Sequence, residues 1–490
     1  MRILFFLHNL SKMRHFDSVI VALAERGHTV VLAAEQRAQA KPLTLPKIAL
    51  NLNRRLAQSD LRGRGGRIEL ATCPVQRSDD WRGIAPALRR ARDYVRFLDP
   101  QYEHADKLRE RAAGYAPEGW PRFLDERRWL RRRPRHLARL LALAERLIPS
   151  DAGFEEFIRA ERPDLVLITP LVHYVTYQTD YVKSAHRLGV PVGFLVFSWD
   201  NLTNGPLVRV QADRTVVWNN TQKRELVAYH QTQPDQIIVT GAPRFDAFFA
   251  MQPSSSREDF LRGVGLEPAS PLFLYICSSA FVAPHEVEFV RRWIAALRAS
   301  ADPAIRESGV LVRPHPAHVE PWERADLSEF LNVACWSAPE TMNADQGLYD
   351  SLFHANAVVG LNTSAMIEAG ILGKSVHTIL TSEFAGGQEQ TIHFGYLRAA
   401  NGGLLHEAHG LGEHIQQLSA ALRTNGMGSD QVRQFVEHFV RPHGLETPVT
   451  PIMVEAIERI ARVAKTPQGN QPLWQRPVRW ALRRYLSTRT

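Results

Sequence analysis

The chain has 490 residues, which is too many for one compact core and predicts about two to three domains. Its hydrophobic content of 44% and charged content of 23% exclude a disordered chain. The three cysteines lie far apart without metal-ligand spacing, which excludes a disulfide framework and favours a reducing compartment. No segment approaches about 18 uninterrupted apolar residues, so we expect a cytoplasmic protein without a membrane span.

The net charge of +9 is concentrated in two segments, 127–135 and 474–485, which interleave arginine with Trp, Leu or Tyr. Such a pattern suits an anionic membrane surface, because cations contact the headgroups and aromatic rings occupy the interface. The alternative is a solvated arginine-rich face. We find no helix-turn-helix, RNP or zinc-finger signature and therefore expect no nucleic-acid partner. The pattern predicts a peripheral protein at the inner face of the membrane.

The N-terminal segment is predicted to form a βαβ unit with strand 3–7, turn 8–14, helix 16–25 and strand 29–33. The turn follows the carboxyl end of the first strand, where open α/β sheets hold their ligands. His8 and His15 are near this turn, and either is a candidate base or a capping or exposed histidine. The region from about 37 to 150 is irregular and basic, with amphipathic helices over 85–98 and 137–147. We interpret it as a helical insertion on the acceptor or membrane side.

Regular α/β alternation returns at the apolar strand 164–169, followed by helix 181–188 and strand 192–197. That strand ends in the polar cluster Ser198–Gly205, which contains Asp200 and is either a site or a simple Asx-turn. Strand 215–218, helix 222–229 and strand 237–240 follow. The small polar segment Gln252–Ser256 is the best linker candidate. It predicts domains at 1–250 and 257–445, followed by helices and a basic aromatic tail at 446–490.

The second domain is predicted to contain strand 272–276, helix 286–298 and strand 310–312, which ends in Arg313-Pro-His-Pro. A further strand, 357–359, leads through Gly360 and a polar turn of Asn362, Thr363 and Ser364 into helix 366–372. Free N–H groups and the helix dipole at such a turn form an anion site. Glu368, one turn later, is placed to accept hydrogen bonds from sugar or ribose hydroxyls. The alternative is an ordinary, well-capped βα unit.

Three of these motifs carry a family resemblance. Residues 237–246 resemble the segment that closes the first domain of GT-B glycosyltransferases and the related UDP-GlcNAc 2-epimerases. Residues 313–316 resemble the strand-end motif of CDP-glycerol glycerophosphotransferases, whose histidine contacts donor phosphate. Gly360–Glu368 resembles the donor-binding βα turn of these enzymes. Asp200 falls where related transferases carry a histidine-glycine motif, and the chain departs from the family by having neither His-Gly-Thr nor Thr-Asp-Tyr-Ser-Ser.

The resemblance implies an α/β protein with two facing Rossmann-like domains of GT-B type, the first on the acceptor side and the second binding the donor nucleotide. It implies a glycosyltransferase that moves a sugar from a nucleotide-sugar co-substrate to a glycan or lipid-linked acceptor in surface polysaccharide synthesis. A single carboxylate base favours inversion. No DxD pair stands in a suitable turn, so we expect no metal and no cofactor.

The site residues that follow from the motifs and the resemblance fall into three groups. Asp200 is the first candidate for the base, and His15 is the second. The donor-binding candidates are Arg313, His315, Asn362, Thr363, Ser364, Glu368, Gly241 and Arg244. The sugar-binding candidates, which otherwise belong to a plain solvated loop, are Glu389, Gln390 and His393. Two rival functions remain open: a sugar-nucleotide 2-epimerase on the same fold, and a non-catalytic scaffold of a polysaccharide assembly complex at the membrane.

Overall fold

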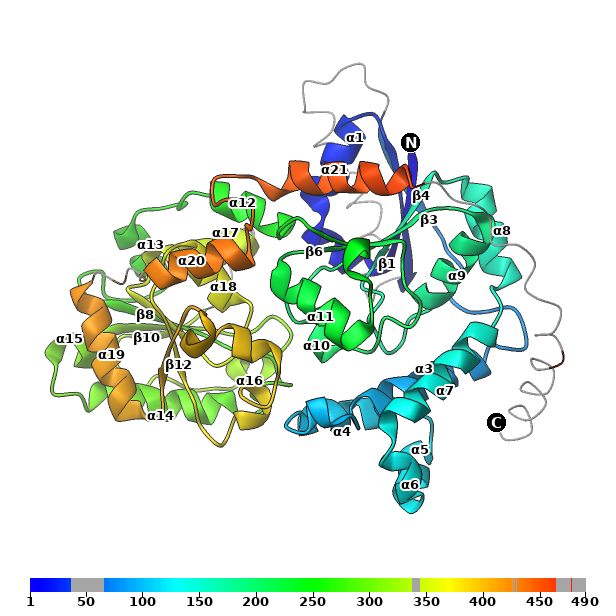
Figure 1. Cartoon of the computed structure of the whole chain (residues 1–490). Helices are drawn as coiled ribbons and strands as arrows, with labels where there is room; N and C mark the ends of the chain where they lie inside the picture. The colour runs from blue at the N-terminus through cyan, green and yellow to red at the C-terminus, as the bar shows by residue number, and fades with distance from the viewer. Residues whose placement is uncertain are drawn as a thin grey trace. The chain divides into compact units, whose positions relative to one another are not determined.

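The computed structural model describes residues 1–36, 66–336, 344–463 except 425, 427 and 429, and residue 477. The chain divides into two compact units (Figure 1). Unit 1 comprises Met1–Arg244 together with Arg441–Thr490, and unit 2 comprises Phe245–Val440. Each unit contains one parallel sheet with helices packed against it, so the prediction of two Rossmann-like α/β domains is confirmed. The second predicted membrane-binding segment, 474–485, lies outside the described residues except for residue 477.

The sheet of unit 1 has seven parallel strands in the order β3-β2-β1-β4-β5-β6-β7. The central strand β1 pairs with β2 on one side and with β4 on the other, so that Ile3 lies opposite both Val30 and Leu165. Parallel strands are covered on both faces and therefore read as continuous apolar runs. The strands are β1 (Arg2–Asn9), β2 (Thr29–Gln36), β3 (Arg67–Ala71), β4 (Leu165–Thr169), β5 (Val192–Leu195), β6 (Arg214–Val217) and β7 (Ile237–Val239).

The helices of unit 1 cover both faces of this sheet. They are α1 (Asp17–Glu25), α3 (Ile84–Arg96), α4 (Asp106–Tyr115), α5 (Trp120–Glu126), α6 (Arg128–Arg131), α7 (Pro134–Leu147), α8 (Ala152–Glu161), α9 (Gln178–Leu188), α10 (Asn201–Asn204), α11 (Asn220–His230) and α21 (Val449–Ala461), with short 3-10 helices η1 (Leu10–His15), η2 (Pro100–Tyr102), η3 (Pro234–Gln236) and η4 (Pro243–Phe245), of which η4 runs into unit 2. We call α3 to α7 (Ile84–Leu147) the helical module.

The last described helix, α21, belongs to the core of unit 1. Its buried side chains Met453, Ile457 and Ile460 pack in one apolar cluster with residues of β1 and α1. A Cβ built on Gly193 in β5 would lie 3.2 Å from Ile460, so the glycine permits the close approach of this helix. The sequence predicted a separate C-terminal region after 445. In the structure, the chain instead comes back to unit 1, where the apolar face of α21 packs against β1 and α1.

The helical module is joined to the sheet layer by buried ion pairs. Asp180 on α9 is fully buried and pairs with Arg77 at 2.5 Å and with Arg89 on α3 at 2.6 Å. Arg89 also pairs with Glu145 on α7 at 3.0 Å. The predicted insertion of 37–150 is thus helical in its second half, but it also contains β3, which the sequence did not predict. This strand pairs in parallel with β2 at the edge of the sheet.

The sheet of unit 2 has six parallel strands in the order β10-β9-β8-β11-β12-β13. The strands are β8 (Leu272–Ile276), β9 (Gly309–Arg313), β10 (Val333–Cys335), β11 (Ala357–Gly360), β12 (Val376–Ile379) and β13 (Leu405–Ala408). Its helices are α12 (Asp246–Ala250), α13 (Arg257–Gly263), α14 (Glu286–Arg298), α15 (Pro303–Arg306), α16 (Glu320–Glu323), α17 (Ala344–His354), α18 (Ala365–Ile371), α19 (Leu411–Arg423) and α20 (Asp430–Phe439), with 3-10 helices η5 (Ala385–Gly387), η6 (His393–Tyr396) and η7 (Ala399–Asn401).

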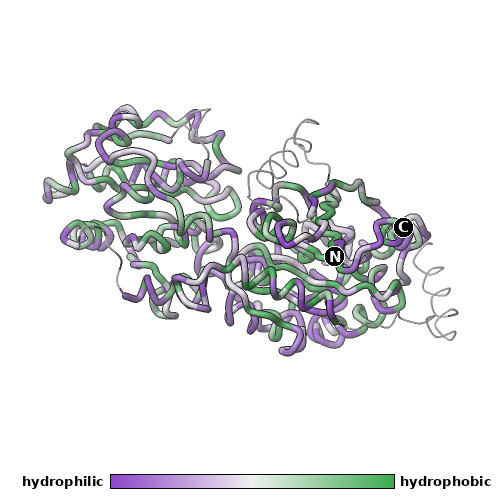
Figure 2. Tube along the Cα trace, turned by 90° about the horizontal axis from the view of Figure 1, so that it is seen from above, coloured by the Kyte–Doolittle hydropathy of each residue, from purple (hydrophilic) through white to green (hydrophobic). Residues whose placement is uncertain are grey.

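The predicted linker Gln252–Ser256 lies inside unit 2, and the division falls earlier, between Arg244 and Phe245. The Ser254 hydroxyl donates to the Asp350 carboxylate at 2.5 Å, and the Phe248 ring lies 5.2 Å from that of Tyr349. These contacts hold the serine-rich segment against α17. Figure 2 shows hydrophobic positions concentrated along the interior of each unit. No described helix is both long enough and apolar enough to cross a membrane.

Candidate functional site

In unit 1, the segments that follow β1 and β5 meet at the carboxyl edge of the sheet. The His15 ring, at the end of η1, lies 4.8 Å from the ring of Phe197, which follows β5. The Lys12 ammonium stands over the same Phe197 ring at 4.3 Å. Ligands of open α/β sheets bind at this edge. The structure therefore brings the turn after β1 together with the polar segment that contains Asp200.

The environment of His15 is cationic. Its pKa is lowered to about 2, mainly by burial and further by the charges of Arg244, Arg14 and Lys12. The Nδ1 atom of His15 is buried without a hydrogen-bond partner in the described part of the chain. An imidazole with so low a pKa is neutral and a weak base. An anion bound beside these cations would stabilise the imidazolium and raise the pKa of His15.

Asp200 is half-buried and held by its own turn. The Ser198 hydroxyl donates to one carboxylate oxygen at 2.6 Å, and the Asn204 side-chain amide donates to the other at 3.3 Å. Asp200 occupies the N-cap position of α10 without capping it through its side chain. Its negative charge acts on Lys12, whose pKa is lowered overall because burial outweighs that attraction. The carboxylate is therefore fixed in orientation next to the cationic turn.

The helical module reaches the same edge through Arg111 on α4, which the sequence did not single out. Its guanidinium donates to the Asn204 amide oxygen at 3.0 Å. The His173 ring, in the loop after β4, lies 4.0 Å from that of His8. The pKa of His173 is lowered to about 4, mainly by burial and additionally by His8, Lys12 and Arg111. The edge therefore combines histidines and cations from three segments.

The turn after β7 contributes Gly241 and Arg244. Gly241 has a φ of +105°, which favours glycine because a Cβ is strained there. This conformation turns the chain from β7 into η4, which carries Arg244. The electrostatic effect of Arg244 on His15 places these two predicted residues in one environment.

In unit 2, three buried polar side chains form a network at the carboxyl edge. The Asn362 backbone N–H, just after β11, donates to the Ser278 hydroxyl at 3.3 Å. Its side-chain amide donates to the Gly387 carbonyl at 2.7 Å and lies 3.4 Å from Nε2 of His393. Asn362 and His393, predicted for donor and sugar, thus come together although they are far apart in sequence.

Glu286, which was not predicted from the sequence, contacts Ser278 of this network. Its carboxyl group accepts from the Ser278 backbone N–H at 2.8 Å and from the Tyr275 hydroxyl at 3.2 Å. Burial raises the pKa of Glu286 to about 7. A carboxyl group with a pKa near neutrality beside an anion-binding turn is typical of functional sites.

Arg313 and Glu368 form a second pair of predicted residues that the structure brings together. The Arg313 guanidinium, at the end of β9, donates to the Gly347 carbonyl at 3.0 Å and lies over the Trp336 ring at 4.3 Å. Burial lowers the pKa of Arg313 to about 10, against the opposing attraction of Glu368 and Asp350. Glu368 is 5% exposed. Arg313 is thus a partly buried cation that two neighbouring carboxylates attract.

The turn into α18 differs from the predicted capping arrangement. Ser364 occupies the N-cap position, but its hydroxyl makes no hydrogen bond to the helix. The carbonyl of Thr363 accepts instead from the Met366 N–H at 3.1 Å. His315 is fixed locally, because its Nδ1 accepts from the Ala317 N–H at 3.1 Å. The Ser364 hydroxyl is therefore not used by the helix.

The polar segment after β12 is divided by the tight turn of η5. Glu389 is exposed and pairs with Arg398 at 2.9 Å, and Gln390 is exposed as well. Gln388, which was not predicted, is buried and donates from Nε2 to the carbonyls of Leu361 and Ile379 at 3.3 and 3.1 Å. Of the three predicted sugar ligands, only His393 is buried beside Asn362. Within the described ranges, no three His, Cys, Asp or Glu side chains are placed to hold a metal ion.

The order of strands and the turns at their carboxyl ends define a GT-B type α/β protein. The structure is similar to that of a glycosyltransferase from Rickettsia africae ESF-5, with a TM-score of 0.52, 11% identity, and coverage of 94% of this chain and 99% of the other. It is also similar to a UDP-GlcNAc 2-epimerase from Neisseria meningitidis bound to UDP-GlcNAc, with a TM-score of 0.50, 13% identity, and coverage of 94% and 100%.

A putative UDP-N-acetylglucosamine 2-epimerase from Listeria monocytogenes gives a TM-score of 0.50 at 13% identity, with 96% of this chain and 99% of the other covered. By sequence, the chain matches no protein-family model and no curated protein. At these identities the similarity establishes the fold alone. The fold therefore confirms the predicted resemblance to the GT-B group of glycosyltransferases and 2-epimerases.

Proposed function

We propose that this protein is a glycosyltransferase that moves a sugar from a nucleotide-sugar donor to a hydroxyl group of a glycan or lipid-linked acceptor, with inversion and without a metal. The observation that carries the proposal is the buried network of Ser278, Asn362 and His393 in unit 2. It follows β8 and β11, and the neighbouring strand β9 ends in Arg313, which Glu368 attracts. Directional hydrogen bonds and one desolvated cation suit a ligand with hydroxyl groups and a diphosphate.

Each residue then has a role in the proposed reaction. Arg313, His315 and the hydroxyls of Thr363 and Ser364 would stabilise the departing nucleoside diphosphate, which gains negative charge as its bond to the sugar breaks. The carboxylate of Glu368 would accept hydrogen bonds from sugar or ribose hydroxyls. His393 would bind the sugar, with Glu389 and Gln390 at the exposed end of the same segment.

In unit 1, Asp200 would take the proton of the acceptor hydroxyl as that oxygen attacks the anomeric carbon. The hydrogen bonds from Ser198 and Asn204 support this role because they fix the carboxylate. His15 is the second candidate, and its low pKa disfavours it unless an anionic ligand is bound. Arg244, which the turn at Gly241 positions, would contribute positive charge toward the donor phosphates.

A panel of nucleotides tests the donor site. UDP, CDP or GDP at about 100 times its dissociation constant should stabilise the folded protein by about 2.7 kcal/mol. Arg313→Gln should abolish the thermal shift, whereas Arg306→Gln, a change at an exposed arginine of unit 2, should leave it intact. No shift with any nucleotide would favour the scaffold over an enzyme.

The Asp200→Asn variant tests the chemistry separately. It should keep the nucleotide-induced shift and lose about 10²–10⁴ in turnover, the usual contribution of a positioned base. Near-normal turnover would show that Asp200 is not the base. The similarity of the fold to 2-epimerases supports that reaction as the second candidate. If a nucleotide sugar alone, without acceptor, is converted to its epimer, the reaction is isomerisation and the proposed transfer is wrong.

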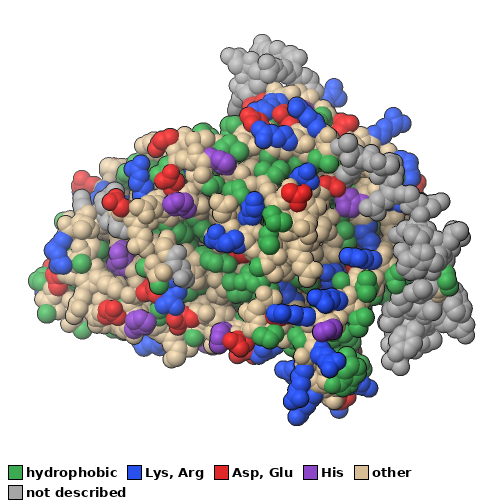
Figure 3. All heavy atoms as spheres, viewed as in Figure 1, with side chains coloured by type: hydrophobic (Ala, Val, Ile, Leu, Met, Phe, Trp, Pro, Cys, Tyr) green, Lys and Arg blue, Asp and Glu red, His purple; other side chains and the backbone are tan. Residues whose placement is uncertain are grey.

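The proposed acceptor side includes an anionic membrane surface. Trp129 on α6 is 65% exposed and is flanked by the exposed arginines Arg127, Arg128 and Arg131. Figure 3 shows arginine and hydrophobic side chains gathered at the tip formed by α5 and α6. Trp129→Ser should weaken co-sedimentation with vesicles containing phosphatidylglycerol, whereas Leu331→Ser, at an 84% exposed site of unit 2, should not. Equal binding of both variants would contradict this contact.

A further inference from the structure

Two adjoining cavities lie in unit 1 between the helical module and the last turn of α11. The first has a volume of about 270 Å³ and the second of about 470 Å³, and both are lined by Arg92, Ala142, His230 and Gln231. None of the site residues described above lines either cavity. A water molecule takes about 30 Å³, so the first cavity has room for an anion of several heavy atoms.

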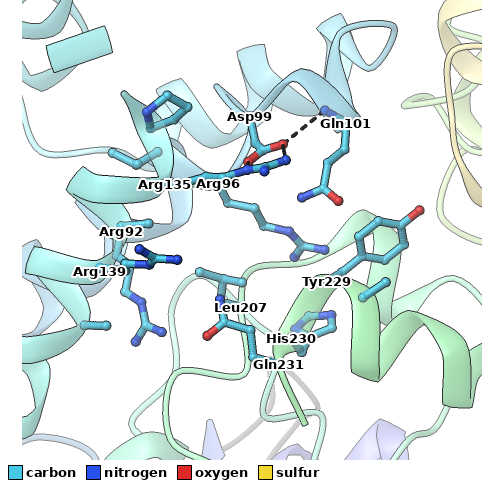
Figure 4. A pocket seen from close by; sticks show the side chains of 15 residues that line it. Arg92, Arg96, Asp99, Gln101, Arg135, Arg139, Leu207, Tyr229, His230 and Gln231 are labelled. Carbon is cyan, nitrogen blue, oxygen red and sulfur yellow. Dashed lines mark hydrogen bonds and ion pairs between the residues drawn. The ribbon is translucent and has the colours of Figure 1, made fainter. Parts of the chain in front are cut away.

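The first cavity is strongly cationic. Arg92, Arg96, Arg135 and Arg139 line it, and the carboxylate that faces them, Asp99, already pairs with Arg135 at 2.7 Å. Figure 4 shows Arg92 and Arg139 on one side of the cavity and Arg96 extending across it toward Tyr229. Four guanidinium groups therefore share one carboxylate. A surplus of positive charge in a recess is the electrostatic signature of an anion site.

Arg92 and Arg96 are hydrogen-bonded mainly to neutral groups, although the carboxylates of Glu145 and Asp93 attract Arg92 electrostatically. Arg96 is 5% exposed and donates only to neutral oxygens: the Tyr102 hydroxyl at 2.8 Å and the carbonyls of Leu202 and Gly205 at 2.9 and 2.8 Å. Arg92 donates to the Arg209 carbonyl at 3.1 Å, and its Nε is buried without a partner. Within the described residues, neither arginine forms an ion pair with a carboxylate. Buried charges that lack a direct ion-pair partner are costly, which favours occupation by an anion.

We propose that this cavity binds a phosphomonoester or diphosphate group, with the guanidinium groups of Arg92, Arg96 and Arg139 as its ligands. Guanidinium forks match the geometry of phosphate oxygens and form charge-assisted hydrogen bonds with them. Val95, Leu207 and the Tyr229 ring also line the cavity and provide apolar surface for an organic substituent of the phosphate. The site is distinct from the proposed nucleotide site in unit 2, so either can fail without the other.

Inorganic pyrophosphate is the first probe, and hydrogen exchange locates its binding. Pyrophosphate should slow exchange of backbone amides in α7 and the end of α11, whereas UDP should slow exchange around α18 if the proposed function is correct. Calorimetry should show that Arg139→Gln weakens pyrophosphate binding in unit 1 about tenfold, as expected for one lost charge-assisted hydrogen bond. Arg92→Gln should weaken it at least as much. The matched control Arg159→Gln, at a 63% exposed position of α8, should change it less than twofold.

Vesicles distinguish a lipid headgroup from a free anion. Binding of the wild type to phosphatidylcholine vesicles containing phosphatidic acid that is weakened in Arg139→Gln and partly displaced by pyrophosphate assigns the cavity to a phosphorylated lipid. Protection by pyrophosphate without this vesicle binding assigns it to a soluble phosphate compound. The proposal is refuted if Arg139→Gln and Arg92→Gln bind pyrophosphate as tightly as the wild type, or if sodium chloride at equal ionic strength produces the same protection of α7. Because Arg139 is exposed, its variant tests the proposal even if Arg92→Gln does not fold.

Discussion

Glu286 offers the sharpest test of the electrostatics beneath the unit 2 network. Its side chain belongs to a residue only 1% exposed, and burial raises its pKa from an ordinary 4.5 to about 7. The hydrogen bonds from Ser278 and Tyr275 favour the charged form and oppose this shift without cancelling it. The informative change is Glu286→Gln, since glutamine has nearly the same shape and stays neutral at every pH.

The magnitude and sign follow from the two pKa values. One pKa unit corresponds to about 1.4 kcal/mol, so the difference between 4.5 and about 7 amounts to about 3 kcal/mol. Between these values the folded protein keeps the proton of Glu286 while the unfolded chain has lost it. The neutral carboxyl group therefore contributes fully to the free energy of unfolding below pH 4.5, and this contribution falls as pH rises to about 7. The Gln variant lacks this decline.

The assay is urea unfolding at a series of pH values from 4.5 to 8, combined with hydrogen exchange of the peptides that cover β8 and α14. Hydrogen exchange of these peptides reports the stability of unit 2 rather than of the whole chain. We expect the free energy of unfolding of wild type to fall relative to Glu286→Gln by about 3 kcal/mol over this range. Glu288→Gln, two residues further along the same helix and exposed, should keep the wild-type profile. Equal pH slopes in wild type and Glu286→Gln would refute the reasoning.

Two further changes test unit 1 by urea unfolding. Asp180→Asn leaves Arg77 and Arg89 buried without their shared carboxylate and should cost about 3–5 kcal/mol. Because these cations hold the pKa of Asp180 at about 2, wild type should also lose stability as pH falls from about 4 to 2, and the variant should lack that loss. A cost below about 1 kcal/mol would contradict the anchoring role. Gly241→Ala, at a φ of +105°, should cost about 1–3 kcal/mol, whereas Gly83→Ala, at a φ of −84° with open space around its Cβ, should be neutral or stabilising. Equal stability of the two glycine variants would show that Gly241 is not strained by a side chain.

The fold could be predicted wherever local pattern and tertiary role agree. The strand β1 and the helix α1 are buried in the core, and their apolar patterns match the strand and helix they form, so both could be predicted. The edge strands β3, β10 and β13 were not predicted, because they carry mixed residues, whereas the edge strand β7 has an apolar run and was predicted. The strand β12 is fully buried but includes His377 and Thr378. These polar residues interrupt the apolar pattern, and the Ser375 hydroxyl, 2.8 Å from the His377 ring, satisfies one of them only in the fold.

The same distinction between local pattern and tertiary contacts applies to the candidate site. Turns at strand ends could be predicted, since small polar residues after an apolar run mark the carboxyl edge. Partners from distant segments could not be predicted: Arg111 reaches Asn204 from the helical module, and Glu286 reaches Ser278 from the next helix. A polar segment also does not reveal which of its residues turns inward. The tight turn of η5 buries Gln388 and leaves its neighbour in the sequence outside.

The carboxyl edges of the sheets of unit 1 and unit 2 differ in the kind of ligand recognition they can perform. The edge of unit 1 acts mainly through charge, because Lys12, Arg14 and Arg244 surround a neutral His15. Charge attracts an anion over distances near a Debye length and weakens with salt. The edge of unit 2 acts through buried, directional hydrogen bonds, which discriminate between ligands that have or lack a matching hydroxyl. Under the proposed function, choice of the donor sugar therefore belongs to unit 2, whereas capture of an anionic ligand belongs to unit 1 and depends more strongly on ionic strength.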